Sequence, residues 1–398
     1  MRSALPVASL VLLAAFSGCR RSHFPDVPAG YREYAYVTNG ASNTVSVLDI
    51  VNLRQDRTLQ VGLNPTGVAV NPVRNEVYVA NTGSGTVSVI NASANRIVAT
   101  IPVHRLPYFI SVEPSGHRAY VANSGSNSVS VIDLDRRREI AVAGTGEQPG
   151  LARISPDMRS LVVTNRGSNS VSIFDVAPYD AAAHGQVLHL RAAFPGCTGA
   201  TDAAILPDSS KTFVACSAGH QVMAINLSAA PGSWAAKQDP ALTTDHVLAL
   251  LDVGLTPVHL ALKPDGGEIF VSNFGSDSIS EISTWTNEVS GTYTIGSKPV
   301  HGIVSSDNST LWVANFGADL ISIYSIDDGK LVATVHTGSA PDALAFSADE
   351  HLLLATDARS GDVSVIRTQG KQGPALFTIL PAGGSPNAIA VKAIEDHP

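Results

Sequence analysis

The sequence predicts an all-β protein, an eight-bladed β-propeller built from four-stranded antiparallel blades. Two observations carry this prediction. A short motif recurs eight times along the 398 residues, and five of the seven spacings between its copies are 42 residues. Each repeat also holds four strand-like runs separated by turn residues. A period of about 40 residues with four strands is typical of a propeller blade.

The repeated motif is clearest at Tyr36-Val37-Thr38-Asn39 and becomes looser along the chain. Its copies end, in order, at Asn39, Asn81, Asn123, Asn165, Cys216, Asn273, Asn315 and Asp357. The copy that ends at Cys216 departs furthest from the first. It is therefore the copy on which the number of blades depends most.

The second repeat shows how the four strands, A to D, follow one another. Strand A covers residues 67–70, B covers 76–80, C covers 86–90 and D covers 96–103. Asn71-Pro72 opens the turn between A and B, because this dipeptide favours turn initiation. Val and Thr or Ser alternate in strand C, the period-2 pattern of a half-buried strand. Pro107, which lacks a backbone donor, opens the next strand A.

The ends of the repeat region predict how the ring closes. The first repeat begins with strand B at residues 33–36, and residues 386–391 form a strand A that no strand B follows. We expect this last strand to complete the first blade, since an unpaired sheet edge invites aggregation. The count is then eight blades, with seven as the alternative. One propeller domain covers residues 34–392, followed by a tail at 393–398.

The N-terminal segment predicts export and a lipid anchor. Residues 1–18 contain Arg2 and a short apolar run, too short for a permanent membrane span. The residues up to Cys19 resemble a bacterial lipobox, which implies lipidation of Cys19, with 19–33 as a tether. Arg20 implies the outer membrane by resemblance to enterobacterial sorting rules. The expected location is the cell envelope, facing the periplasm or the cell surface. An ordinary signal peptide is the alternative.

The repeat resembles a known family. Tyr-Val-x-Asn followed by Gly-Ser-x-Ser-Val-Ser-Val-Ile-Asp is similar to the YVTN-repeat propellers, which include surface-layer-type and YncE-like proteins. The resemblance covers about residues 34–392. It implies the fold and leaves the function open, and many relatives have seven blades.

Charge and cysteine content narrow the classes of partner. The formal net charge is −8 and the longest basic run is Arg136 to Arg138, so no cationic footprint for nucleic acid is present in the sequence.

An export route permits disulfides. Pairing of the strands about residues 207–210 would bring Cys197 and Cys216 together, which predicts a disulfide. Two buried thiols are the alternative.

Two connections between strands C and D are longer than the rest. The extra residues are 177–186 and 228–245, in successive blades. Adjacent long loops on a rigid scaffold are frequent partner sites, so they are candidates for binding a protein or glycan. Neutral variation in loop length is the alternative.

One set of side chains is a candidate ligand site. The second residues after the leading position of strand A are, by blade, Gly67, Phe109, Leu151, Asp202, His259, His301, Ala343 and Ala388. Asp202, His259 and His301 come from three successive blades and should converge at the channel mouth. They could bind a small ligand or a metal ion such as Zn, Fe or Cu, or simply line a water-filled channel. Arg153 should pair with Asp202.

The leading functional prediction is a binding or scaffold module for a protein, glycan or small ligand, without catalysis of its own. No nucleophile elbow, Walker loop, zinc tetrad or dinucleotide fingerprint is present, so no catalytic residue is assigned. Propeller lactonases and quinone-dependent dehydrogenase subunits provide the enzymatic and redox alternatives. Haem d1 propellers also place two histidines from neighbouring blades over the cofactor. His104 is only a loose match to their axial-ligand strand. No cofactor is required by the sequence.

Overall fold

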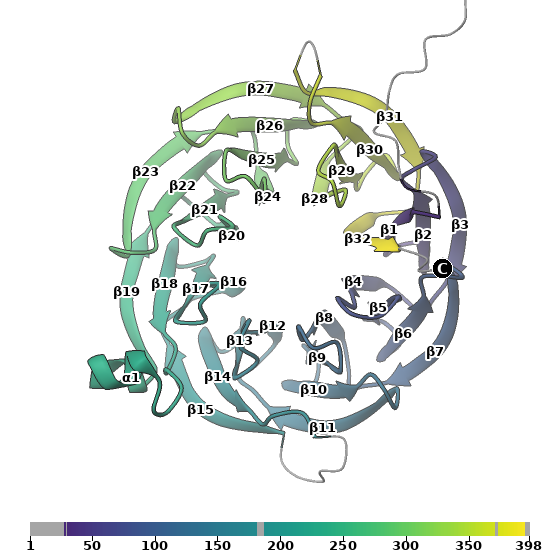
Figure 1. Cartoon of the computed structure of the whole chain (residues 1–398). Coiled ribbons are helices and arrows are strands. Elements are labelled where there is room, and N and C mark those ends of the chain that lie inside the picture. Colours follow the sequence, from purple (N-terminus) through teal and green to yellow (C-terminus); the bar gives the residue numbers. More distant parts are fainter. Residues whose placement is uncertain (1–27, 29, 181–186, 371–372, 395–398) are drawn as a thin grey trace, which may run out of the picture.

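The protein forms one closed ring of antiparallel blades. The structure is a computed structural model that describes residues 28, 30–180, 187–370 and 373–394. In this part of the chain the strands form eight four-stranded sheets, arranged around a central axis in Figure 1. The predicted eight-bladed propeller is confirmed, and the seven-bladed alternative is wrong. The predicted signal peptide and Cys19 lie outside the described residues.

The strands of each blade run from A at the axis to D at the rim. In that order, blade 1 holds β32 (Pro386–Ile394), β1 (Arg32–Asn39), β2 (Thr44–Asp49) and β3 (Arg54–Gln60), and blade 2 holds β4 (Pro65–Val70), β5 (Glu76–Asn81), β6 (Thr86–Asn91) and β7 (Arg96–Pro102). Blade 3 holds β8 (Pro107–Val112), β9 (Arg118–Asn123), β10 (Ser128–Asp133) and β11 (Arg138–Gly144), and blade 4 holds β12 (Pro149–Ile154), β13 (Ser160–Asn165), β14 (Ser170–Val176) and β15 (Leu188–Pro195). Blade 5 holds β16 (Ala200–Ile205), β17 (Lys211–Cys216), β18 (Gln221–Asn226) and β19 (His246–Asp252), and blade 6 holds β20 (Pro257–Leu262), β21 (Glu268–Asn273), β22 (Ser278–Ser283) and β23 (Glu288–Thr294). Blade 7 holds β24 (Pro299–Val304), β25 (Thr310–Asn315), β26 (Leu320–Ser325) and β27 (Lys330–His336), and blade 8 holds β28 (Pro341–Phe346), β29 (Leu352–Asp357), β30 (Asp362–Arg367) and β31 (Ala375–Pro381).

The last strand closes the ring, as predicted. β32 is the inner strand of blade 1 and pairs with β1 from Arg32↔Ile394 to Asn39↔Pro386. The pairing extends two residues beyond each predicted boundary of the propeller. The first and last strands are therefore held in one sheet, and β1 is paired on both sides, with β32 and with β2.

The two faces of the ring carry different connections. The A–B and C–D connections meet at one face, which we call the AB–CD face, as when Ala92 donates its N–H to the carbonyl of Asn75. The D–A and B–C connections form the opposite DA–BC face. Because β1 starts and β32 ends beside each other, both described ends of the propeller lie at the AB–CD face.

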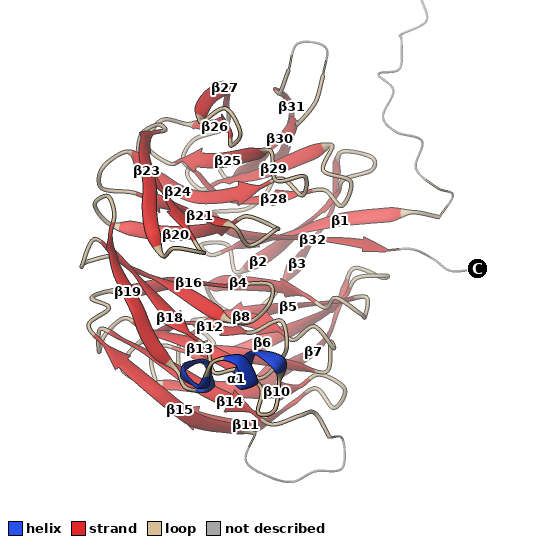
Figure 2. Cartoon of the chain, turned by 60° about the vertical axis from the view of Figure 1, so that its left-hand side comes forward, coloured by secondary structure: helices blue, strands red, loops and turns tan. Residues whose placement is uncertain are grey.

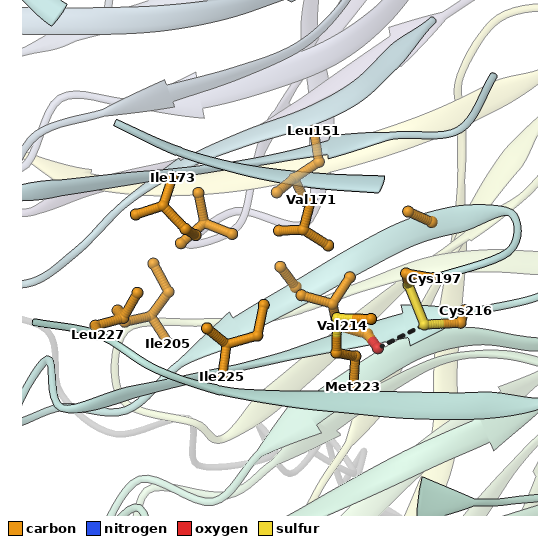
Figure 3. Close-up of a cluster of buried hydrophobic side chains, with 13 residues drawn as sticks. Leu151, Val171, Ile173, Cys197, Ile205, Val214, Cys216, Met223, Ile225 and Leu227 are labelled. Atoms are coloured by element: carbon orange, nitrogen blue, oxygen red, sulfur yellow. Dashed lines mark hydrogen bonds between the residues drawn. A yellow bond between two sulfur atoms is a disulfide. The ribbon is translucent and has the colours of Figure 1, made fainter. Parts of the chain in front are cut away.

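Apolar packing between blades holds the ring together. Eight clusters of buried side chains each draw mainly on two neighbouring blades. Figure 3 shows the cluster between blades 4 and 5, where Leu151 and Val171 lie opposite Val214 and Ile225. A blade cannot bury its apolar faces alone, so stability comes from the stacking of neighbours.

The same cluster contains a disulfide. Cys197 and Cys216 are bonded, with their Cα atoms 4.8 Å apart. Cys197 precedes β16 and Cys216 ends β17, so the bond ties the entry of blade 5 to its first hairpin (Figure 3). Cys216 occupies the position that carries an asparagine in six other blades. The disulfide therefore takes the place of a side-chain hydrogen bond that supports those blades.

That hydrogen bond joins strands B and C. The side-chain amide at the end of strand B donates from Nδ2 to the serine seven residues later, both groups being buried. The pairs are Asn39–Ser46, Asn81–Ser88, Asn123–Ser130, Asn165–Ser172, Asn273–Ser280 and Asn315–Ser322. A satisfied buried polar pair of this kind fixes the register of the two strands.

Blade 8 carries a carboxylic acid in this position. Oδ2 of Asp357 accepts a hydrogen bond from Ser364 at 2.7 Å, while its Oδ1 is buried without a partner. Burial, with a smaller contribution from Asp362, raises the pKa of Asp357 to about 7. Above that pH the fold must hold a buried carboxylate where related blades hold a neutral amide.

Replacing this acid by an amide should stabilise the protein at alkaline pH. In the wild type the folded-state pKa of about 7 lies above the unfolded value, so stability present at low pH is lost as the pH rises through 7. We expect Asp357→Asn to raise the free energy of unfolding on the order of 2 kcal/mol at pH 8, with little change near pH 4. Urea unfolding at both pH values measures this, and parallel pH profiles for the two proteins would contradict it.

The long C–D connection of blade 5 carries the helical residues that the structure describes. In blade 5 the connection contains α1 (Trp234–Gln238) and a short 3-10 helix (Pro240–Thr243), and α1 lies at the outer edge of the ring in Figures 1 and 2. In blade 4, Tyr179 stacks on His117 with ring centroids 4.6 Å apart. No helix among the described residues is long and apolar enough to cross a bilayer.

Candidate functional site

The candidate site lies where the eight A strands surround the axis. A cavity of about 760 Å³ opens at the DA–BC end, and residues from all eight A strands line it. A second cavity, of about 400 Å³, lies toward the AB–CD end. Arg153, His259 and His301 line both cavities, so they stand between them. The larger volume is in the range of small-ligand sites.

A repeated irregularity turns side chains into the larger cavity. In every blade the pairing of strands A and B shifts register just after the first residue of strand A. Such a bulge leaves an extra residue without a cross-strand partner and changes the direction of its side chain. The residues directly after the leading position all line the cavity: Thr66, Tyr108, Gly150, Thr201, Val258, Val300, Asp342 and Asn387.

Asp202 is fixed by the backbone of two blades. Its Oδ1 accepts the N–H of Ala203 at 2.8 Å, and its Oδ2 accepts the N–H of Leu260 in the next blade at 2.9 Å. The guanidinium of Arg153 lies 3.6 Å from Oδ1, so the predicted ion pair is present. These contacts make Asp202 a link between β16 and β20, and they offset its negative charge.

His259 and His301 contact each other on neighbouring strands. Their ring centroids are 4.0 Å apart. Nδ1 of His259 accepts the N–H of Gly302 at 3.3 Å, which leaves the ring proton on Nε2, 3.8 Å from Oδ2 of Asp202. Nδ1 of His301 is buried and has no hydrogen-bond partner. The structure thus brings all three predicted residues together.

Both imidazoles are neutral at physiological pH. Burial, and after it the charge of Arg153, lowers the pKa of His259 to about 3. Burial lowers the pKa of His301 well below its usual value, with a further contribution from His259. Neutral rings can donate or accept hydrogen bonds to a ligand but contribute no positive charge.

The three residues are poorly arranged for a metal ion. In the part of the chain that the structure describes, no group of three or more His, Cys, Asp and Glu side chains is placed to hold one. Asp202 uses both carboxylate oxygens on backbone N–H groups, and His259 uses Nδ1 in the same way. Metal ligands need free lone pairs that converge on one point. This arrangement does not favour a metal ion at the three residues.

Cationic and aromatic groups complete the wall. Arg153 lies over the ring of Phe109, 5.7 Å from its centroid, and Arg166 lines the same cavity. Tyr108 and Phe274 add two further aromatic rings. Aromatic faces beside guanidinium groups favour planar or cyclic molecules that carry a negative charge.

Asp342 is the acidic residue in this wall that the sequence analysis missed. Burial raises its pKa to about 6. Within the described structure it takes part in no hydrogen bond or ion pair, unlike Asp202. A carboxyl group without a partner in a cavity is a candidate for ligand contact or proton transfer. Asp342 lies one residue before Ala343, the strand A position at which the blades are compared, so the acidic residue was visible in the sequence.

His104 lies away from this site. Its Nε2 is 3.5 Å from Glu139 on the neighbouring blade, and it lines neither of the two cavities. The residue that loosely matched the axial-ligand strand of haem d1 propellers therefore does not fit that role. His259 and His301 do satisfy the other part of the resemblance, two histidines from neighbouring blades facing one cavity.

Fold and site together define the protein as an eight-bladed β-propeller with a ligand-sized cavity at one end of its axis. Residues 300–388 match a family model described as "Lactonase, 7-bladed beta-propeller". The match covers blades 7 and 8 up to the start of β32, and includes His301 and Asp342. None of the curated proteins matches the chain.

Solved structures with similar folds cover most of the chain. One is the dihydro-haem d1 dehydrogenase NirN in complex with DHE, with a TM-score of 0.72 and 15% identity over 90% of this chain and 74% of that one. A putative 6-phosphogluconolactonase from Bacteroides fragilis has a TM-score of 0.61 and 13% identity over 93% and 100%. Hydrazine synthase from Kuenenia stuttgartiensis has a TM-score of 0.54 and 21% identity over 84% and 92%. At such identities these likenesses show the propeller fold alone.

Proposed function

We propose that this protein is a lipid-anchored propeller of the cell envelope that binds a small, cyclic organic anion at the DA–BC end of its axis. The observation that carries the proposal is the 760 Å³ cavity, whose wall combines two arginines, three aromatic rings and two neutral histidines. Guanidinium groups favour a carboxylate on the ligand, and the rings favour a flat or cyclic skeleton. The proposed anchor is Cys19, directly after the proposed signal peptide of residues 1–18.

The pKa of Asp342 gives this proposal a pH signature. The group is protonated below about pH 6 and charged above it. A carboxylate ligand should therefore bind more tightly at pH 5 than at pH 7.5, by about 1 kcal/mol or a factor of about five, because the like charge disappears at low pH. In Asp342→Asn the affinity should stay at the higher level at both pH values.

The measurement starts from a panel of aromatic and alicyclic carboxylic acids. A thermal-shift screen identifies a probe from the panel, and titration calorimetry at pH 5 and pH 7.5 then gives its affinity. Asp328→Asn is the matched control, since Asp328 is an exposed partner of Lys330 in the C–D turn of blade 7. The proposal fails if no acid in the panel binds, or if Asp342→Asn keeps the pH dependence of the wild type.

A haem-type molecule belongs among the candidate ligands. One of the similar structures is a dihydro-haem d1 dehydrogenase in complex with DHE. His259 and His301 provide the pair of histidines that the haem d1 resemblance implies, while His104 does not fit the axial position. The visible absorption spectrum of protein purified from its native membrane tests this ligand.

The second candidate function is hydrolysis of a lactone. Its support is the lactonase family model, which matches the segment that carries His301 and Asp342. Asp342, when ionised, would take a proton from the water that attacks the ring carbonyl. The ester C–O bond would then break, and the proton would pass to the leaving alkoxide to give a hydroxy acid. A lactone screen with Asp342→Asn tests this, and unchanged turnover in the variant rules out the proposed base.

A further inference from the structure

Two tryptophans stand out on the AB–CD side of the ring. Trp285, in the C–D turn of blade 6, is 84% exposed, and Trp234, on α1 of blade 5, is 76% exposed. The third tryptophan, Trp312, is only 3% exposed and packs edge-on against Phe346 in the core. Exposed indole rings are costly in water and are enriched at membrane–water interfaces.

The turn that presents Trp285 is firmly held. The hydroxyl of Thr284 donates to the carbonyl of Gly266 at 2.6 Å, and Nζ of Lys211 in blade 5 donates to the carbonyl of Thr284 at 2.7 Å. Asn287 donates its N–H to Ser283, which closes the turn. The indole is therefore directed outward by an ordered turn, tied to its own blade and to the neighbouring one.

The chain enters the propeller at the same face, on the opposite side of the ring. β1 begins at Arg32, whose guanidinium donates to the carbonyl of Ser93 in a C–D turn at 2.8 Å. In Figure 1, β1 lies across the axis from β19 and β23, which follow the two tryptophans. Twelve residues separate Cys19 from Arg32. A relaxed chain of that length spans about 20 Å, so the anchor keeps this face close to the lipid.

We propose that the AB–CD face docks on the membrane, with the lipid anchor at blade 1 and Trp285 and Trp234 inserted into the interface at blades 5 and 6. The inference rests on the lipid anchor proposed above. A tether at one edge alone leaves the ring free to tilt, whereas indoles at the opposite edge hold it flat. The ligand cavity at the DA–BC end then opens away from the lipid, toward the aqueous compartment.

The charge of this face selects the kind of lipid. Its A–B turns carry five aspartates: Asp157, Asp208, Asp265, Asp307 and Asp349. Two of these carboxylates pair with cations of the same turns, Asp157 with Arg159 and Asp265 with Lys263. The face therefore carries charges of both signs, which fits a zwitterionic leaflet.

Quenching of tryptophan fluorescence by lipid tests the inference. The lipidated full chain is reconstituted on phosphatidylcholine vesicles with and without brominated acyl chains. We expect brominated lipid to quench the wild-type emission, Trp312→Phe to keep that quenching, and Trp234→Phe/Trp285→Phe to lose most of it. Iodide added to the buffer should quench the vesicle-bound protein less than the free protein.

The outcomes separate the two proposals. If the wild type bears no lipid on Cys19 and does not float with vesicles, the anchor proposal fails. The docking inference then fails with it. If the wild type floats, Cys19→Ala does not, and brominated lipid leaves the wild-type emission unchanged, only the docking inference is overturned. Full quenching by iodide in the bound state would also overturn it, and would leave the face open to an aqueous protein partner.

Discussion

A chain that ends at Ser385 is expected to lose its cooperative unfolding transition and to aggregate. The truncation removes β32, which pairs with β1 along its whole length. It exposes the edge of β1 and the buried side chains of Ala35, Val37 and their neighbours in the cluster shared with blade 8. The loss should exceed about 5 kcal/mol, the lower end of the stability of whole domains. Light scattering and thermal unfolding measure it.

The control for this truncation is a chain that ends at Ile394. It keeps every residue of β32 and should unfold at the wild-type midpoint. A synthetic peptide of residues 386–394 should partly restore the shorter chain by adding a strand to its open edge. A monomeric, cooperatively unfolding chain without β32 would contradict the role that we assign to ring closure.

Breaking the buried ion pair of blade 3 should be the next most damaging change. Nε of Arg118 donates to Oε2 of Glu113 at 3.0 Å, and both side chains are almost fully buried. Tyr120 and Ser115 also donate to this carboxylate, and Arg118 donates to the carbonyl of Ala177. Arg118→Met leaves the Glu113 charge buried without its partner, so we expect a loss of about 3–5 kcal/mol in guanidinium unfolding.

A double-mutant cycle separates the charge from the packing. If the loss comes from the stranded carboxylate, Glu113→Gln should recover part of it in the Arg118→Met background. Strictly additive losses would show that packing alone is responsible. A surface pair gives the baseline, since Arg54→Met removes a largely exposed partner of Asp49 and should cost at most about 1 kcal/mol.

The fold could be predicted from the sequence because each blade repeats the same pattern of four strands and turns. Strand A opens with proline in most blades, and strand B ends with an amide that bonds to strand C. The orphan strand at 386–391 predicted the closure correctly, and Cys197 and Cys216 are bonded. The helix α1 was not predicted, because the inserted segment lies outside the repeat and has no counterpart in another blade.

The candidate site was only partly predictable. Comparing blades at the second position of strand A identified Asp202, His259 and His301, which the structure brings together. It overlooked Asp342, because alternation along a regular strand assigns neighbouring residues to opposite faces. The bulge in every strand A breaks that rule and lets two successive residues line one cavity. The spacing of residues in the sequence also cannot show that both carboxylate oxygens of Asp202 accept hydrogen bonds from backbone N–H groups.

Ring closure by the last strand also orders the biosynthesis of the protein. Translation runs from the N-terminus, so β1 is made long before its partner β32, the last strand that the structure describes. Seven blades can assemble from consecutive segments, but the first blade is finished only after β32 has been made. A product that terminates before β32 therefore has an incomplete first blade, with β1 at an open edge of the sheet.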